Sequence, residues 1–154
     1  MSKIAIFPGS FSPFTIGHKS VVDKMLPLFD KIIIGVGTNS SKKEFYDIKK
    51  RINWINSVYK ENNKVETKEY AGLTVDFCIQ ENAKYIIRGI RDANDFTYEK
   101  KIANMNRSLN SNVETIFVLT PSNYSHISST LIRDIIKNKG DVIRFLPKEI
   151  AKDF

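Results

Sequence analysis

Three short stretches of the chain carry residue types that bind phosphate groups and support chemistry on them. The first is PGSFSPFTIGH, residues 8–18, which follows an apolar run and ends in a histidine. Pro8, Gly9 and Pro13 would shape a loop whose backbone can approach a ligand closely. His18 then stands at the predicted start of a helix, where free N–H groups and a partial positive charge suit phosphate. Taken alone, His18 could equally be a helix-start residue with an ordinary structural hydrogen bond.

The other two stretches also follow predicted strands. IRGIRD, residues 87–92, places Arg88 and Arg91 just after a buried strand. Guanidinium groups match the geometry of phosphate oxygens, although two solvated surface arginines would give the same pattern. ISSTLIR, residues 127–133, would combine hydroxyls with free N–H donors at a helix N-terminus, although a plain capping sequence also fits. Three such stretches at three strand ends together indicate a phosphate-binding site.

The elements that must position these stretches alternate between strands and helices. Apolar runs predict strands at residues 3–7, 31–37, 64–69, 85–88 and 113–119. Apolar residues spaced three or four apart predict helices at residues 17–29, 47–60, 74–82, 95–109 and 128–138. The alternation predicts an α/β fold, a Rossmann-like doubly wound five-stranded parallel sheet with helices on both faces. In such sheets ligands bind beyond the carboxyl ends of the strands, where the strand order reverses.

Polar residues and one glycine mark the expected ends of the helices. Asp47, Thr74 and Asp95 stand where N-caps are predicted, and Gly140 is predicted to end the last clear helix.

The composition predicts one soluble globular domain, residues 1–154. The chain is 42% hydrophobic and 27% charged, as ordinary soluble proteins are. No apolar run reaches the roughly 18 residues that a membrane span needs, so we expect no membrane partner. The N-terminus lacks a signal-peptide pattern. The single cysteine, Cys78, allows no internal disulfide, and we expect it to be a small core residue in a reducing cytoplasm.

The formal net charge of +7 suggests an anionic partner without identifying it. Lysine pairs at residues 42–43, 49–50 and 100–101 would suit a nucleic-acid-binding module, which is one alternative reading. However, the basic residues are spread along the chain and no RNA- or DNA-binding motif occurs. We therefore expect no nucleic-acid partner.

Several familiar nucleotide and catalytic motifs are missing from the sequence. No P-loop occurs, and GVGTNS at residues 35–40 lacks the third glycine of G-x-G-x-x-G and follows the second predicted strand. No Cys/His cluster has metal-ligand spacing, and no G-x-S-x-G is present. The sequence thus offers no obvious covalent nucleophile, and we predict no protein-held metal site.

Two of the stretches resemble signatures of a known superfamily. TIGH resembles the (H/T)-x-G-H signature of the nucleotidyltransferases, and ISSTLIR resembles their I-S-S-T-x-x-R signature. Within that superfamily the chain is similar, over nearly its whole length, to the bacterial phosphopantetheine adenylyltransferase family. The likeness is carried by PGSF, TIGH, Ser41-Lys42-Lys43, GLTVDF, IRGIRD, DFTYE, MNRSL, YSHISST and GDVIRFLP. One departure is Ser12, because the family commonly has aspartate at this position.

The resemblance implies transfer of the adenylyl group of ATP to 4′-phosphopantetheine, giving dephospho-coenzyme A and pyrophosphate in coenzyme A biosynthesis. The attacking phosphate is already ionised at neutral pH, so the reaction calls for positioning and electrostatic stabilisation and needs no general base. The resemblance further implies Mg²⁺ that arrives with ATP, and a homohexamer. The two superfamily signatures alone leave open another nucleotidyltransferase with a different acceptor phosphate.

The resemblance also implies which residues form the site. His18 would stabilise charge that develops around the α-phosphate. The phosphopantetheine site would comprise Ser10, Lys42, Thr74 and Arg88. The ATP site would comprise Ser10, Phe11, His18, Gly89, Ile90, Arg91, Glu99, Tyr124, Ser125, His126, Ile127, Ser128, Ser129 and Thr130. Glu99 alone could instead be half of an i,i+4 surface pair on its helix.

Overall fold

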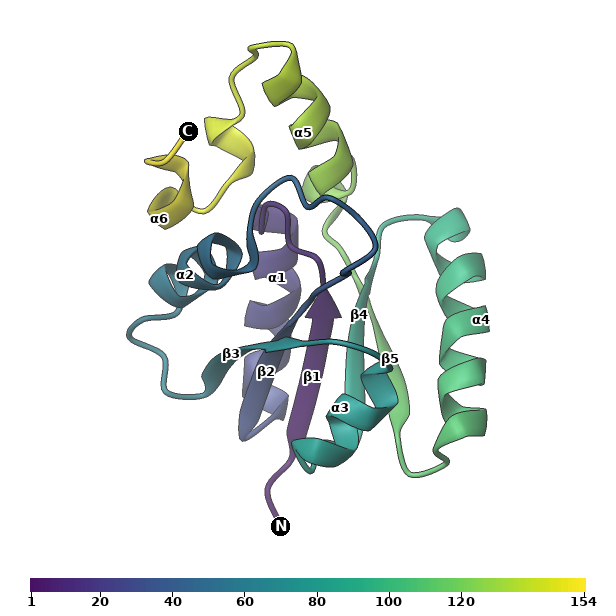
Figure 1. Cartoon of the computed structure of the whole chain (residues 1–154). Helices are drawn as coiled ribbons and strands as arrows, with labels where there is room; N and C mark the ends of the chain where they lie inside the picture. The colour runs from purple at the N-terminus through teal and green to yellow at the C-terminus, as the bar shows by residue number, and fades with distance from the viewer.

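An all-parallel sheet of five strands forms the centre of the computed structural model, which describes residues 1–154 (Figure 1). The strands are β1 (Ile4–Gly9), β2 (Lys31–Gly37), β3 (Val65–Tyr70), β4 (Tyr85–Ile90) and β5 (Glu114–Leu119). They lie in the order β3-β2-β1-β4-β5, so the order reverses between β1 and β4. The predicted doubly wound parallel sheet is therefore confirmed, and its switch point lies at the carboxyl end of β1, which includes Pro8 and Gly9 of PGSF.

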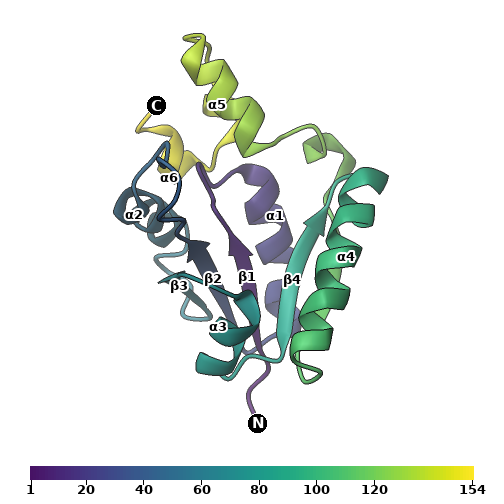
Figure 2. The same ribbon diagram turned by 45° about the vertical axis from the view of Figure 1, so that its right-hand side comes forward.

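Six helices surround the sheet: α1 (Ile16–Met25), α2 (Ile48–Val58), α3 (Thr74–Gln80), α4 (Ala93–Leu109), α5 (Ser129–Lys137) and α6 (Lys148–Ala151). Successive residues of β1 point to opposite faces, as a strand requires. Ala5 and Phe7 belong to the larger apolar core with residues of α1 and α2, whereas Ile6 packs with Phe77 of α3 in a second core. Helices thus cover both faces of the sheet (Figures 1 and 2).

The C-terminal helices lie beyond the carboxyl end of the sheet. In both views α5 stands above the ends of β1 and β4, and α6 lies beside α2 (Figures 1 and 2). The starts of α1 and α5 therefore face the switch point of the sheet. None of the helices combines the length and the apolar character that crossing a bilayer requires.

Two of the predicted helix caps are wrong. Leu73, not Thr74, is the N-cap of α3, and the Thr74 hydroxyl lies 3.1 Å from the Tyr70 hydroxyl. Helix α4 starts earlier than predicted because Asp92 is its N-cap and accepts a hydrogen bond from the Asp95 N–H at 2.8 Å. The carboxylate of Asp95 is then free for another partner.

The other two predicted helix ends are confirmed. Asp47 is the N-cap of α2 and accepts from the Lys50 N–H at 2.8 Å. Beyond α5, Lys139 has a positive φ of 59° and the Gly140 N–H donates to the Ile135 carbonyl at 2.8 Å. A Cβ on Gly140 would lie 2.5 Å from the Ile135 side chain, so only glycine fits this position without a shift.

Candidate active site

Two adjoining clefts open at the carboxyl edge of the sheet. We call the first the histidine cleft, about 340 Å³ in volume, because His18 lines it. We call the second the lysine cleft, about 710 Å³ in volume, because Lys42 lines it. The two clefts share a wall made of Pro8, Gly9, Ser10, Arg88, Glu99 and Arg133. A group bound in either cleft therefore lies against the same cationic wall.

The histidine cleft brings together the three stretches that the sequence separates. Its lining includes His18 from the first stretch, Arg88 and Arg91 from the second, and Ser128 to Thr130 from the third. Ser128 is the N-cap of α5, and the Ser129 hydroxyl donates to the Pro13 carbonyl at 2.8 Å. This last bond ties the start of α5 to the loop that precedes α1.

Reciprocal capping at the start of α1 fixes the orientation of His18. The Thr15 hydroxyl accepts from the His18 N–H at 3.2 Å, and the Thr15 N–H donates to Nδ1 of His18 at 3.0 Å. Because Nδ1 accepts this bond, the hydrogen-bond pattern assigns the proton of the neutral ring to Nε2. The imidazole packs against Phe11 and Phe14, with ring centroids 5.0 and 5.5 Å away.

Burial lowers the pKa of His18 to about 3, with smaller contributions from the charges of Arg88 and Arg91. The ring is therefore neutral at physiological pH in this structure. A neutral His18 with its proton on Nε2 is a hydrogen-bond donor in the cleft, suited to an anionic oxygen.

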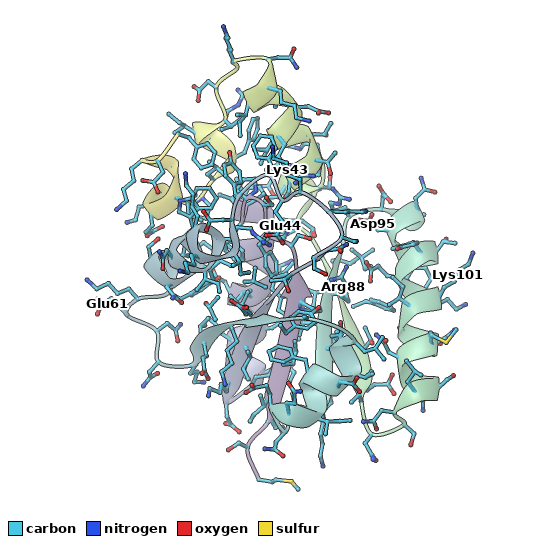
Figure 3. The ribbon with its side chains drawn as sticks, viewed as in Figure 1. Lys43, Glu44, Glu61, Arg88, Asp95 and Lys101 are labelled. Carbon is cyan, nitrogen blue, oxygen red and sulfur yellow. The ribbon has the colours of Figure 1, made fainter.

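The arginines of IRGIRD are held by carboxylates of α4. Arg88 forms a two-pronged ion pair with Glu99, with Nε 2.8 Å and Nη2 2.6 Å from the two carboxylate oxygens. Arg91 pairs in the same way with Asp95, at 3.0 and 3.2 Å, and this hydrogen bonding lowers the pKa of Asp95. Figure 3 labels both Arg88 and Asp95 on the side of α4 that faces the sheet, whereas the exposed Lys101 points outward. The arginines are thus neither free nor simply solvated.

Glu99 is only 8% exposed, and this contradicts the alternative in which it forms a surface pair. Arg88 also donates from Nη1 to the Pro8 carbonyl at 2.7 Å. These three bonds leave two of the five guanidinium N–H groups available for an anion.

Arg133 is a site residue that the sequence predictions did not include, although it is the last letter of ISSTLIR. It lines both clefts and donates to the Ser12 carbonyl at 2.7 Å and the Thr130 hydroxyl at 3.3 Å. No carboxylate forms an ion pair with it, in contrast to Arg88 and Arg91. The side chain of Ser12 is buried, and its hydroxyl has no hydrogen-bond partner.

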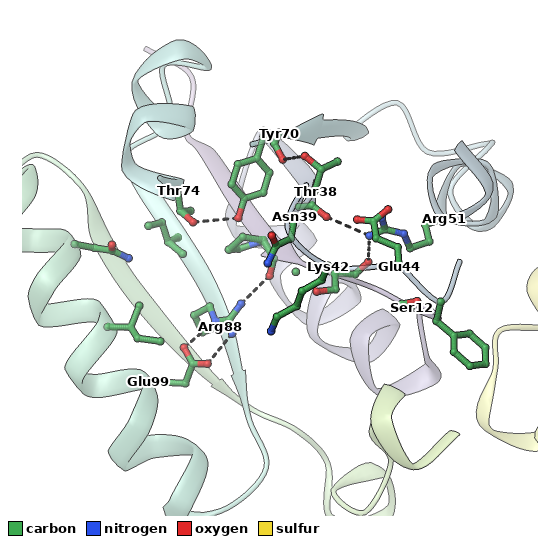
Figure 4. A pocket seen from close by; sticks show the side chains of 18 of the residues that line it. Ser12, Thr38, Asn39, Lys42, Glu44, Arg51, Tyr70, Thr74, Arg88 and Glu99 are labelled. Carbon is green, nitrogen blue, oxygen red and sulfur yellow. Dashed lines mark hydrogen bonds and ion pairs between the residues drawn. The ribbon is translucent and has the colours of Figure 1, made fainter. Parts of the chain in front are cut away.

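The lysine cleft gathers the residues predicted to bind the acceptor. Lys42, on the segment between β2 and α2, is exposed and points toward the Arg88–Glu99 pair (Figure 4). Thr74 lies across the cleft with Tyr70, and Ser10 joins them from the shared wall. The far side is formed by one face of α4, which contributes Ile102, Ala103 and Asn106. An extended molecule with an anionic end fits such a lining.

Four predicted site residues line neither cleft. Ile90 is buried at the end of β4, and Tyr124, Ser125 and His126 lie in and after a short 3₁₀ turn before α5. The His126 ring faces Phe145, with centroids 6.4 Å apart. The other predicted residues line at least one of the two clefts. The roles of all of them remain predictions.

No group of three or more His, Cys, Asp or Glu side chains is placed to hold a metal ion. The two carboxylates of the histidine cleft, Asp95 and Glu99, are both engaged by arginines.

A model of the cytidylyltransferase-like family matches residues 6–135. The chain therefore belongs to this class of proteins, the cytidylyltransferase-like family. The phosphopantetheine adenylyltransferase of Cytophaga hutchinsonii is 47% identical over 150 residues, which cover 97% of this chain and 100% of that protein. The one from Christiangramia forsetii is 43% identical, with 97% and 99% covered, and one from Clostridium perfringens is 41% identical, with 98% and 92% covered. Within the class, the chain belongs with the phosphopantetheine adenylyltransferases.

A solved structure supports the fold independently. A Vibrio parahaemolyticus protein assigned as a nicotinate-nucleotide adenylyltransferase superimposes with a TM-score of 0.71 at 22% identity, covering 99% of this chain and 97% of that one. At this identity the likeness concerns the fold alone.

Proposed function

We propose that this chain transfers the adenylyl group of ATP to 4′-phosphopantetheine, producing dephospho-coenzyme A and pyrophosphate. The observation that carries the proposal is the shared wall of the two clefts, where Ser10, Arg88 and Arg133 border both. Two polyanions bound side by side repel each other, and cationic groups between them offset this repulsion. The names of the relatives supply the identity of the acceptor.

ATP occupies the histidine cleft in this proposal. The N-terminus of α5, with Ser128 to Thr130, presents backbone N–H groups and hydroxyls to the phosphates. Nε2–H of His18 donates to an oxygen of the α-phosphate and stabilises the charge that develops there during the reaction. Because Nδ1 accepts from Thr15, the donor is held in place before the substrate arrives.

Phosphopantetheine occupies the lysine cleft. Lys42 and the remaining N–H groups of Arg88 bind its phosphate, and the pantetheine arm extends past Thr74 along α4. The acceptor phosphate, already ionised, attacks the α-phosphorus of ATP. The bond from that phosphorus to the bridging oxygen breaks, and pyrophosphate leaves with the electron pair. No side chain needs to remove a proton or form a covalent bond.

Mg²⁺ enters as part of the MgATP substrate. It usually keeps several waters and binds substrate phosphates. The pairing of Asp95 and Glu99 with arginines fits this arrangement, because it leaves the cleft without an uncommitted carboxylate pair.

The assembly in this proposal is a homohexamer. Helix α4 exposes large apolar side chains that line neither cleft, namely Phe96, Tyr98, Met105 and Leu109, and exposed apolar surface often marks an interface. We also propose a cytoplasmic location, since Cys78 is a buried free thiol, as is usual for proteins of reducing compartments.

The test is incubation with MgATP and one acceptor at a time, followed by mass analysis. The expected products are dephospho-coenzyme A and pyrophosphate with 4′-phosphopantetheine. Turnover with nicotinate mononucleotide, or with another phosphorylated acceptor in place of phosphopantetheine, would support the alternative of a different nucleotidyltransferase. Replacing ATP with CTP tests the choice of nucleotide in the same assay.

A further inference from the structure

Arg51 is buried in the wall of the lysine cleft, yet the proposed reaction does not use it. Its side chain is only 2% exposed and lies on the face of α2 that also buries Trp54 and Ile55. A buried charge is costly unless hydrogen bonds and an opposite charge compensate it. The position of Arg51 therefore calls for a specific role.

The guanidinium of Arg51 joins three segments of backbone. Nη1 donates to the Ser10 carbonyl at 2.7 Å and to the Gly37 carbonyl at 3.2 Å. Nε donates to the Tyr46 carbonyl at 3.0 Å. Nη2 lies 2.7 Å from the Glu44 carboxylate, which balances the charge, but Nη2 forms no hydrogen bond. Nη1 and Nε of Arg51 therefore bond to the protein backbone, and Nη2 is held by the ion pair alone (Figure 4).

Two of these segments carry the proposed ligands of the acceptor phosphate. Ser10 is one of them, and Lys42 lies on the segment 38–46, between the contacts that Arg51 makes at Gly37 and at Glu44 and Tyr46. This segment contains no helix or strand. Arg51 therefore clamps both of its ends and links them to the Ser10 loop.

We propose that Arg51 is a positioning residue for phosphopantetheine, which sets the separation of Ser10 and Lys42 without contacting the substrate. The proposal rests on the proposed function, because it assigns Ser10 and Lys42 to the acceptor. Arg51 does not line the histidine cleft, where the contacts of Thr15 with His18 and of Ser129 with Pro13 hold the starts of α1 and α5. Loss of Arg51 should therefore weaken acceptor binding selectively.

Steady-state kinetics with each substrate varied in turn test this proposal. In Arg51→Gln, the KM for phosphopantetheine should rise about tenfold or more, while the KM for ATP stays within about threefold. Arg51→Lys keeps the positive charge but loses the planar guanidinium group. Its KM for phosphopantetheine should therefore lie between those of the wild type and Arg51→Gln. Arg107→Gln is the matched control, because Arg107 is exposed and its only ion pair is with Glu114 on the surface. Its constants should equal those of the wild type.

The apparent kcat and the two KM values together distinguish a positioning role of Arg51 from a merely structural one. General destabilisation would lower the active fraction, and thus the apparent kcat, with both KM values unchanged. That result, or an equal rise in both KM values, would overturn the proposal. If Arg51→Gln does not fold, Glu44→Gln replaces it in the test, because it removes the counter-ion of Arg51. Glu44 is partly exposed, so the protein should fold with an amide at this position. An acceptor KM raised about threefold with an unchanged ATP KM supports the proposal, and an unchanged acceptor KM contradicts it.

Failure of the proposed function is visible separately. A wild-type enzyme that makes no dephospho-coenzyme A refutes the function itself. A wild-type enzyme that turns over phosphopantetheine, with variants that show no selective change, refutes only the role of Arg51.

Discussion

The histidine cleft and the lysine cleft share a wall but are held in shape by different means. Around the histidine cleft, capping bonds between residues three apart fix the starts of α1 and α5, as between Thr15 and His18. The lysine cleft depends on an irregular segment whose ends are held by one buried arginine, Arg51, through contacts with residues 5, 14 and 41 positions away. His18 is thus oriented by the cap of its own helix, whereas the position of Lys42 depends on contacts that Arg51 makes elsewhere on the segment. We therefore expect catalysis to depend mainly on the first cleft and acceptor affinity mainly on the second.

The largest expected effect comes from the histidine cleft. His18→Ala should lower kcat about 10³-fold, because it removes a held donor to the reacting phosphate. The melting temperature should stay within about 5 °C of the wild-type value, because the first turn of α1 keeps most of its contacts. His126→Ala removes the other imidazole of the chain, which lies outside both clefts. Because the predicted role of His126 is in ATP binding, this control should keep kcat near the wild-type value, and any effect should fall on the KM for ATP. Near-normal turnover of His18→Ala would remove this residue from the mechanism.

Arg88→Ala tests whether the wall shared by the two clefts binds the phosphate of the acceptor. The KM for phosphopantetheine should rise about 30-fold, and that for ATP by a smaller factor. The substitution also leaves the buried Glu99 without its partner, so the free energy of unfolding should fall by about 2–4 kcal/mol. Chemical denaturation together with substrate-dependent kinetics measures both effects. Equal rises in the two KM values would show that Arg88 does not distinguish the clefts.

Arg133→Gln tests the part of the wall that has no counter-ion. Arg133 lines both clefts and pairs with no carboxylate, so its charge acts on both substrates. Both KM values should rise by a similar factor, about fivefold, at low ionic strength, and the effect should shrink as salt screens the charge. A change confined to one substrate would place Arg133 in a single cleft.

The last prediction concerns the pH dependence of stability and not catalysis. The pKa of His18 is about 3 in the folded chain, below its ordinary value of 6.5. Between these values the unfolded chain binds a proton that the folded chain excludes, so the free energy of unfolding rises with pH over this window. Above the window the ring is neutral in both states and contributes nothing.

Denaturation of His18→Gln between pH 4.5 and 6.5 checks this prediction. The variant should show a shallower rise with pH than the wild type, because the groups that titrate in both proteins cancel in the comparison. Parallel curves would mean that His18 titrates alike in both states.

Much of the fold was accessible from the sequence because its determinants are local. Strand β2 follows directly from the apolar run KIIIGVG, and the observed bounds match the prediction. Position at a strand end is also a local property, so His18, Arg88 and the hydroxyls before α5 were found as neighbours of one site.

The pairings within the site could not be predicted in the same way, because they depend on how elements pack. Glu99 bonds to Arg88 only because α4 packs against the sheet with Glu99 next to this residue of β4. Asp92 and Asp95 are both residue types that cap helices; in the structure Asp92 caps α4 and the Asp95 carboxylate pairs with Arg91. The burial of Arg51 has one signal in the sequence, a charge among the apolar positions of its helix at Ile48, Ile52 and Ile55.

The central claim is that the two clefts hold both substrates at once, so that the acceptor phosphate attacks ATP directly. Initial rates measured over a grid of ATP and phosphopantetheine concentrations test it. The two-cleft arrangement predicts intersecting double-reciprocal lines, as a ternary complex requires. Parallel lines, the pattern of an enzyme that is covalently modified by one substrate before the other binds, would contradict it.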